Sequence, residues 1–217
     1  MILKASTVSA KNFLINASKK KTIFKERKEV LLKIAEEITA DFLKKSTINI
    51  NFIGKNNART SQICQVWAFL ASKKFQLPIH SFSGGIEVTS FHRNTIKVLQ
   101  KSGFHFQLDN FSHQNPKYSI SYNNEKTTIL VFSKHYDNAI NKEPFIAITT
   151  CDKSLNQFIT NRSFTNEYHL PYFDLKTIDG SVNQEEKYEA INQQIASEMY
   201  FLFSTIKKVS LKSNSDY

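Results

Sequence analysis

The stretch from residue 48 to residue 62 reads Ile48-Asn49-Ile50-Asn51-Phe52-Ile53-Gly54-Lys55-Asn56-Asn57-Ala58-Arg59-Thr60-Ser61-Gln62. Its first six residues alternate between apolar and polar side chains, which predicts a β-strand. Residues 54–60 form a short polar loop, and from Ser61 onward apolar residues recur at helical spacing. Strand, loop and helix in this order are the unit from which parallel sheets are built. Because such sheets bind ligands beyond the carboxyl ends of their strands, this loop is the first candidate for a functional site.

The same patterns continue along the rest of the chain. Helices are predicted over 24–45, 61–78, 93–101 and 184–208, and strands over 48–53, 79–83, 118–122, 127–133 and 145–150. Asn123-Asn124 between two of the strands predicts a β-hairpin, and Gly84-Gly85 at a strand exit is expected to provide backbone freedom. We therefore predict a single three-layer α/β domain whose central, mainly parallel sheet is covered on both faces. The predicted division is an N-terminal helical extension (1–46), an α/β domain containing the inserted hairpin (47–208) and a polar tail (209–217).

The net charge of +10 is concentrated near the N-terminus, at Lys19-Lys20-Lys21 and at residues 25–28. No aromatic residues alternate with these lysines and no nucleic-acid motif accompanies them, so we interpret them as a solvated helix face and expect no nucleic-acid partner. No apolar run is long enough to span a bilayer, so no membrane association is expected and a cytoplasmic protein is the default. Of the two cysteines, Cys64 lies on the apolar face of its helix and is expected in the core.

The loop and its flanks resemble the phosphate-binding segment of the low-molecular-weight tyrosine phosphatases and thioredoxin-coupled arsenate reductases. In that family an apolar strand runs into Cys-x5-Arg-Ser/Thr, usually with an Asn inside the loop, and a helix follows. Residues 50–62 follow the same order, with Asn56 and Asn57 inside the loop. The resemblance implies the phosphatase α/β fold over nearly the whole chain. It also implies a loop whose backbone N–H groups surround an oxyanion at the positive end of a helix.

Two later segments extend the resemblance. Leu170-Pro171-Tyr172-Phe173-Asp174 is similar to the loop that delivers the family's general acid, which places Asp174 in that role. Thr149-Thr150-Cys151-Asp152 is similar to the strand end that carries the first redox cysteine of the arsenate reductases. No cysteine lies between 155 and 159, where the second would fall, so a disulfide relay is not expected. We favour structural roles for both residues, a turn cap for Asp174 and a buried thiol for Cys151.

The sequence departs from the family at the two positions that carry its chemistry. Alignment on Ser61 places Gly54 at the nucleophile position and Thr60 at the arginine position. A shift of one residue brings Arg59 to the arginine position but Ile53 to the nucleophile position, so no register restores a cysteine. Glycine has no side chain, so a covalent intermediate cannot form there. Loss of the guanidinium also removes charge stabilisation of the transition state.

The leading hypothesis is therefore a non-catalytic protein of this fold that binds an oxyanion or a phosphorylated partner. The binding residues would be those of the loop: Gly54, Lys55, Asn56, Asn57, Ala58, Arg59, Thr60 and Ser61. A second hypothesis is an active phosphatase or arsenate reductase with relocated chemistry, using Cys151 and Asp174. A third is a basic binder of nucleic acid or of an acidic partner, using the N-terminal lysines. No cofactor is expected, and no metal, because the six histidines lack zinc-ligand spacing; the oligomeric state stays open.

Overall fold

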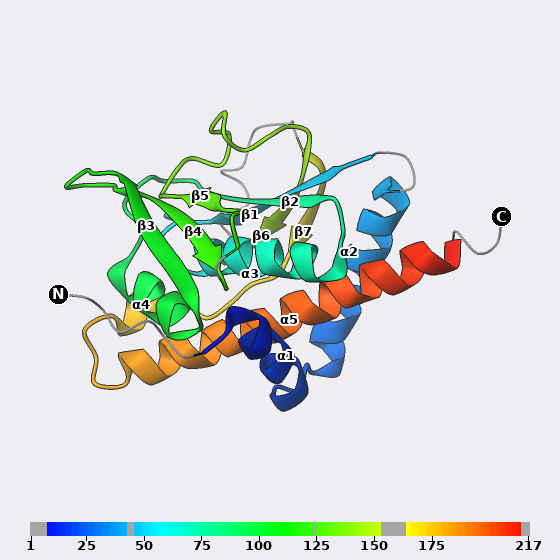
Figure 1. Ribbon diagram of the computed structural model, residues 1–217, viewed down its shortest axis with the longest axis horizontal. Helices are drawn as coiled ribbons and strands as arrows, with labels where there is room; N and C mark the ends of the chain where they lie inside the picture. The colour runs from blue at the N-terminus through cyan, green and yellow to red at the C-terminus, as the bar shows by residue number, and fades with distance from the viewer. Residues whose placement is uncertain (1–7, 43–45, 124, 153–163, 214–217) are drawn as a thin grey trace.

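The computed structural model describes residues 8–42, 46–123, 125–152 and 164–213 (Figure 1). Its helices are α1 (Ala10–Lys20), α2 (Lys25–Phe42), α3 (Thr60–Phe75), α4 (Arg93–Lys101) and α5 (Gln184–Ser213), with a 3-10 helix, η2, at Leu175–Ile178. Its strands are β1 (Ile48–Gly54), β2 (Ile79–Gly85), β3 (Phe104–Asn110), β4 (Lys117–Tyr122), β5 (Ile129–Val131), β6 (Phe145–Thr149) and β7 (Phe164–His169). No described helix is long and apolar enough to cross a bilayer.

Four strands form one parallel sheet in the order β2-β1-β6-β7. The β1–β2 register runs from the pair Ile48–Ile79 to the pair Gly54–Gly85, so the two strands end together. Helix α3 follows β1, as the opening stretch of the sequence predicted. The predicted α/β class with a parallel central sheet is therefore confirmed.

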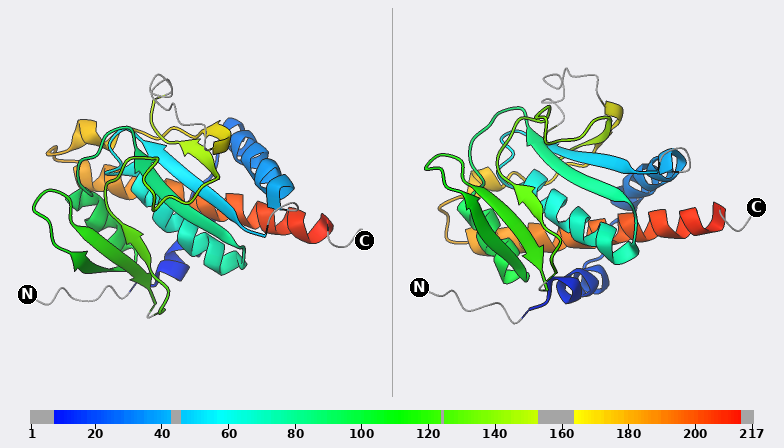
Figure 2. Two further views of the ribbon diagram at one scale, coloured as in Figure 1. Left: turned by 90° about the horizontal axis from the view of Figure 1, so that it is seen from above. Right: turned by 45° about the horizontal axis from the view of Figure 1, so that its top comes forward.

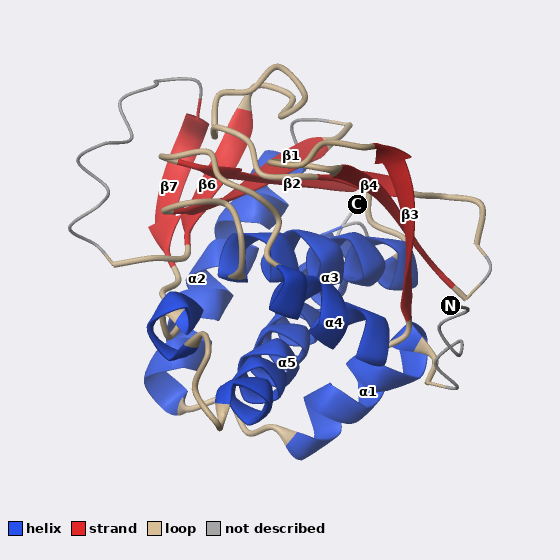
Figure 3. Cartoon of the chain, turned by 90° about the vertical axis from the view of Figure 1, so that its left-hand side faces the viewer, coloured by secondary structure: helices blue, strands red, loops and turns tan. Residues whose placement is uncertain are grey.

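The two faces of this sheet are covered differently. Alternate residues of β1, such as Ile50 and Phe52, enter the main core with the helices, which gather on one side of the sheet in Figure 3. Ile53 points into a second, smaller cluster with Tyr136 and Phe145. The second face is thus covered near Ile53 by the chain that follows β5, whereas the helices supply the main core. The alternation of β1 decides this division because successive side chains leave a strand on opposite sides.

The predicted hairpin exists, but it belongs to a larger sheet. Strands β4 and β5 are antiparallel, and β3 joins them to give the order β3-β4-β5. Asn123 sits in the expected turn with φ +48°. Figures 1 and 2 show this small sheet beside α4, on the opposite side of the molecule from β7. Strands β3 and β7 were both missing from the sequence analysis.

The first helix, α1, was also missed, because residues before Phe24 were read as a polar start. Ser9 caps α1 through a hydrogen bond from the Asn12 N–H group (3.4 Å). Phe13 stacks on Trp67 with ring centroids 5.2 Å apart, and Leu14 is fully buried. The apolar stripe is too narrow to stand out among the lysines. Its burial therefore depends on α3 and α5, against which α1 packs.

The last helix is longer than predicted. It continues past residue 208 to Ser213, so the first part of the predicted polar tail is helical. Ile206 is fully buried and Ser210 nearly so, which gives this end of α5 a packed side. Residues 43–45, at the end of the helix predicted over 24–45, lie outside the described residues, as do residues 214–217 of the tail.

Candidate functional site

The loop between β1 and α3 lies at the carboxyl edge of the parallel sheet, as the sequence predicted. Gly54 ends β1 opposite Gly85, the last residue of β2. On the other side, Ile53 pairs with Thr149, the last residue of β6. The Thr150 N–H group continues this pairing by donating to the Ile53 carbonyl (2.7 Å). The ends of three strands therefore surround the start of the loop.

Each carbonyl group of the loop, from Gly54 to Arg59, accepts a hydrogen bond from the surrounding protein. Gly54 accepts from the Ile86 N–H group (3.2 Å) and Lys55 from the Glu87 N–H group (2.8 Å). Asn56 accepts from the hydroxyls of Ser133 (2.8 Å) and Thr89 (3.2 Å), and Asn57 from the Gln62 side-chain amide (3.1 Å). Ala58 accepts from the His92 N–H group (3.1 Å) and Arg59 from the Ile63 N–H group (3.0 Å). The loop is thus held in place by the hydrogen bonds that its carbonyl groups accept. Such complete use of carbonyl groups holds the backbone in one shape.

The N–H groups of the same loop are used differently. Across the described residues, none of the N–H groups of residues 55–61 donates a hydrogen bond to the protein. The last of them belong to the first turn of α3, whose amino end carries partial positive charge. Consecutive free N–H groups at such a position are suited to bind an anion by donating hydrogen bonds to it.

Asn57 determines the turn of the loop. Its backbone is left-handed, with φ +47°, a conformation that Asn adopts more readily than most residues. Its side chain donates to the Ser61 hydroxyl (3.0 Å) and accepts from the Lys134 N–H group (3.1 Å) and from the Gln62 amide (3.0 Å). Asn57 is almost completely buried. Its side chain therefore joins the loop to α3 and to the segment after β5, and does not face a ligand.

Gly84 and Gly85 are required for close approach, not for backbone freedom. Neither has a positive φ, so the sequence-based explanation was wrong. A Cβ atom on Gly85 would lie 2.8 Å from the Asn57 nitrogen, and one on Gly84 would lie 2.3 Å from the Tyr136 Cα atom. Both contacts are with backbone, which cannot move aside cheaply. Gly85 therefore allows the end of β2 to pack directly against the loop backbone at Asn56 and Asn57.

Hydroxyl groups border Gly54 and Thr60, the two positions at which the loop differs from the motif that it resembles. A Cβ atom on Gly54 would lie 3.1 Å from the Ser61 Oγ atom and 3.4 Å from the Thr150 Oγ1 atom. The Thr60 Oγ1 atom is also 3.4 Å from Thr150 Oγ1. A Cβ atom at position 54 would therefore be tightly placed, but its nearest neighbours are side-chain atoms, two of them hydroxyl oxygens.

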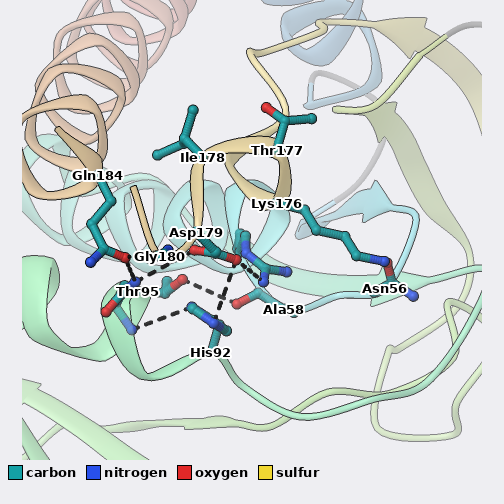
Figure 4. Close-up of polar contacts among 12 residues, drawn as sticks. Asn56, Ala58, His92, Thr95, Lys176, Thr177, Ile178, Asp179, Gly180 and Gln184 are labelled. Atoms are coloured by element: carbon teal, nitrogen blue, oxygen red, sulfur yellow. Dashed lines mark hydrogen bonds and ion pairs between the residues drawn. The ribbon is translucent and has the colours of Figure 1, made fainter. Parts of the chain in front are cut away.

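Arg59 does not turn toward the free N–H groups. Its Nε atom donates to the Tyr188 hydroxyl (3.0 Å), and its Nη2 atom forms an ion pair with Asp179. Tyr188 in turn donates to Asp179 Oδ1 (2.8 Å), and His92 Nε2 lies 3.6 Å from Asp179 Oδ2. Figure 4 shows Asp179, His92 and Gln184 together in this cluster. The Arg59 guanidinium therefore fastens the turn after η2 to α5, and only the backbone of this predicted site residue remains for a ligand.

The electrostatics of the cluster favour an ionised Asp179. Burial by itself would raise the pKa of Asp179, but hydrogen bonds from Tyr188 and Arg59 outweigh burial and lower it. For His92, burial and the Arg59 charge lower the pKa, while Asp179 opposes them. His92 is thus held as a neutral ring, and its Nδ1 atom accepts from the Asn94 N–H group (3.4 Å) at the start of α4.

We expect Asp179→Ala to lower the free energy of unfolding by about 1–3 kcal/mol at pH 7, because Arg59 and Tyr188 lose a common partner in a partly buried place. Since the pKa of Asp179 is depressed in the folded state, its contribution is present above the unfolded pKa and is lost as pH falls through the folded pKa. Urea unfolding at pH 7 and at pH 3 tests this. A variant that is equally destabilised at both pH values would show that the ion pair is not the cause.

Asp174 acts as a cap. Its carboxylate accepts a hydrogen bond from the Lys176 N–H group (2.9 Å) at the start of η2, and the residue is exposed. This is the structural role that the sequence analysis favoured. Figure 4 shows the Lys176 side chain extended toward Asn56, so the segment also presents a cation to the loop. Lys55 is exposed at the same edge, whereas Glu87 accepts from the Asn56 amide (2.7 Å) and adds a negative charge.

The two cysteines are separate free thiols. Cys64 is fully buried in α3, and its pKa is raised by burial, which confirms the predicted core position. Cys151 follows β6 and is half-buried, and burial raises its pKa as well, with Asp152 and Asp174 contributing. A raised pKa keeps the Cys151 thiol protonated at neutral pH, which does not favour it as a nucleophile. Residues 155–159, where a second redox cysteine was sought, lie outside the described residues.

Sequence reasoning missed the residues that hold the loop from a distance. Asp179, Tyr188 and His92 come from three different parts of the chain and meet only in the folded protein. Lys134 and Ser133, which hold Asn57 and Asn56, were assigned to no site at all. None of these residues belongs to a local motif, so no sequence signal marked them.

Solved structures similar to this chain fall into two groups of enzymes. They are phosphatases and arsenate reductases. The YwlE arginine phosphatase of Geobacillus stearothermophilus is 12% identical, with a TM-score of 0.47 over 76% of this chain and 96% of that one. A low molecular weight protein tyrosine phosphatase of Bacillus subtilis is 11% identical, with a TM-score of 0.47 over 74% and 98%. The Corynebacterium glutamicum thioredoxin-dependent arsenate reductase is 14% identical, with a TM-score of 0.45 over 93% and 85%.

No protein-family model and no curated protein matches the sequence. The similar structures include low-molecular-weight phosphatases and an arsenate reductase, the two kinds of enzyme whose loop motif the sequence resembles. At identities this low, the chemistry of the site has to be inferred from the geometry of this chain alone.

Proposed function

We propose that the loop from Gly54 to Ser61 binds a phosphate-like oxyanion, free or on a phosphorylated partner, without turning it over. One observation carries the proposal: the loop carbonyls are all bonded to the protein, while the N–H groups of residues 55–61 are not. An anion satisfies several such donors at once with charge-assisted hydrogen bonds, which are stronger than those to a neutral acceptor. The amino end of α3 adds to the attraction, and Lys55 and Lys176 lie at the same edge.

The absence of turnover follows from the side chains. Position 54 has no nucleophile, and the guanidinium that the loop itself carries, that of Arg59, is bound to Asp179 and Tyr188. Asp174 caps η2, and Cys151 has a raised pKa. Binding depends on the backbone, which is intact, whereas chemistry depends on side chains that are absent or engaged elsewhere. A cytoplasmic location is compatible with this role and remains part of the proposal.

Titration with sulfate, followed by backbone amide NMR, tests the proposal directly. Sulfate does not titrate near neutral pH, so its binding is not confused with protonation of the ligand. We expect the amide signals of residues 55–61 to shift together and to saturate. Gly54→Ala should retain binding, since its Cβ atom meets only the Ser61 side chain closely. Gly85→Ala should weaken binding by about tenfold or more, because a contact with the Asn57 backbone costs ~1–3 kcal/mol.

A second variant separates the loop from the basic N-terminal segment. Replacement of Lys19, Lys20 and Lys21 by Ala should leave the saturating shifts of the loop unchanged. If that variant loses sulfate binding, or if wild-type shifts cluster at residues 19–28 and fall steeply with salt, the protein is a general binder of anionic partners and the loop is not its site.

A further inference from the structure

Lys134 is a buried lysine to which no carboxylate of the described residues is bonded. It follows β5, is 1% exposed, and its Nζ atom makes no hydrogen bond with any described residue. The Nζ atom lies over the Phe132 ring, 5.1 Å from the ring centroid. A buried ammonium without a carboxylate is costly, so the amine favours its neutral form. Burial lowers the pKa of Lys134 to about 7.

The charged groups around Lys134 do not compensate for this burial. Lys117 on β4 lies over the same Phe132 ring, 4.8 Å from Nζ to the centroid, and adds positive charge. Glu87, after β2, is occupied by the Asn56 amide. His135 and Asp137 pair with each other at the surface. The elements that face Lys134 from the loop and from α3 contribute the neutral amides of Asn57 and Gln62.

The backbone of Lys134 helps to hold the anion loop. Its N–H group donates to the Asn57 side chain (3.1 Å), and its carbonyl accepts from the Gly85 N–H group (2.9 Å). The preceding residue, Ser133, donates to the Asn56 carbonyl (2.8 Å). The Lys134 side chain is 1% exposed, and this stretch of backbone covers it together with the loop, so we infer that the side chain reaches water by moving the stretch. Departure of the side chain would therefore release Asn57, which gives the loop its turn.

We propose that Lys134 is a proton-sensitive lock on the anion loop. With a neutral amine, residues 132–136 stay packed against the loop and the loop keeps its shape. A protonated amine favours water over its buried position, so uptake of a proton shifts the equilibrium toward an open state in which the hydrogen bonds to Asn57 and Gly85 are broken. The lock concerns the shape of the loop; only its consequence for binding rests on the proposed function. A fall in pH from the alkaline range toward neutrality would therefore loosen the site without any titration of the ligand.

The direction of the pH dependence follows from linkage. In the closed state the pKa of Lys134 is about 7, whereas a solvent-exposed lysine has its ordinary value of 10.5. Between these values opening takes up one proton, so the opening equilibrium constant should rise about tenfold for each unit by which pH falls. Below pH 7 the closed state is protonated as well, and the dependence levels off. Stability is therefore highest at alkaline pH and declines toward neutrality.

Amide hydrogen exchange at Gly85 measures this opening without any ligand. After correction for the intrinsic exchange rate, its protection should fall about tenfold per pH unit from pH 9 to pH 7 in the wild type. In Lys134→Met, which keeps the volume and removes the charge, protection should not change with pH. The Ile50 amide in the middle of β1 reports global unfolding, and Gly85 should exchange faster than it. His135→Gln should behave as the wild type.

Three results would overturn the lock: equal pH slopes in the wild type and Lys134→Met, identical protection of Gly85 and Ile50, or loss of the slope in His135→Gln. The sulfate titration is independent of these measurements. A normal lock with no sulfate binding would count against the proposed function alone, and sulfate binding with no pH-dependent protection would count against the lock alone.

Discussion

The double substitution Gly54→Cys and Thr60→Arg is expected to give this protein aryl phosphatase activity, while the wild type stays at the background rate. A Cβ atom at position 54 meets the hydroxyls of Ser61 and Thr150 at 3.1 and 3.4 Å, so a thiol placed there has polar neighbours. The amino end of α3 favours the thiolate. Return of a guanidinium should raise the rate about 10²–10³-fold over Gly54→Cys alone, the effect usual for one lost charge-stabilising group.

Hydrolysis of para-nitrophenyl phosphate provides the measurement. Gly54→Ser with Thr60→Arg is the matched control, because oxygen in place of sulfur keeps the size and removes most of the nucleophilicity. The double variant should also keep its activity when Cys151→Ser is added. If the wild type hydrolyses the ester and Cys151→Ser abolishes that turnover, the protein is an enzyme with relocated chemistry. If the double variant binds sulfate yet remains inactive, the loop suits binding but not in-line attack.

Glu198→Ala is expected to lower the free energy of unfolding by about 3–5 kcal/mol, because it leaves a largely buried arginine without its partner. The Glu198 side chain is 2% exposed and that of Arg27 is 18% exposed. The carboxylate accepts from Arg27 Nε (3.0 Å), from Arg27 Nη2 (2.8 Å) and from the Tyr172 hydroxyl (2.7 Å). One group on α5 thereby anchors both α2 and the segment that leads to Asp174.

Urea unfolding at pH 7 measures this loss, and Glu189→Ala is its control on the same helix. Glu189 pairs with Lys101 at 3.1 Å, but both side chains are about half exposed, at 47% and 52%. Such a pair contributes roughly 0–1 kcal/mol. Equal losses of unfolding free energy in the two variants would show that burial does not make the Arg27–Glu198 pair more stabilising than an exposed ion pair.

Local patterns were sufficient for the elements that form the site. The alternation in residues 48–53 and the helical spacing after Ser61 predicted β1, the loop and α3 at nearly their observed bounds. Helix α4 begins and ends at the predicted residues, since Gly103 stops it with φ +98°. These features depend on a few neighbouring residues, whose periodicity is visible without a fold.

Elements that depend on distant partners were missed. Helix α1 owes its burial to Trp67 and α5, and β7 owes its place to pairing with β6. The small sheet was predicted as a hairpin because β3 reaches its partner β4 only through tertiary contacts. Propensity cannot reveal such elements, because their stabilisation comes from surfaces far away in the sequence.

By itself the sequence determined that position 54 carries no nucleophile, that position 60 carries no guanidinium, and that the loop lies between a strand and a helix. It placed Arg59 in that loop but could not tell where its side chain goes. The tertiary structure decided that Arg59 binds Asp179, that Gly85 is needed for contact with Asn57, and that Lys134 Nζ is buried without a hydrogen-bond partner among the described residues. Residue identity is local information, whereas burial, pairing and the direction of a hydrogen bond exist only between segments that folding brings together.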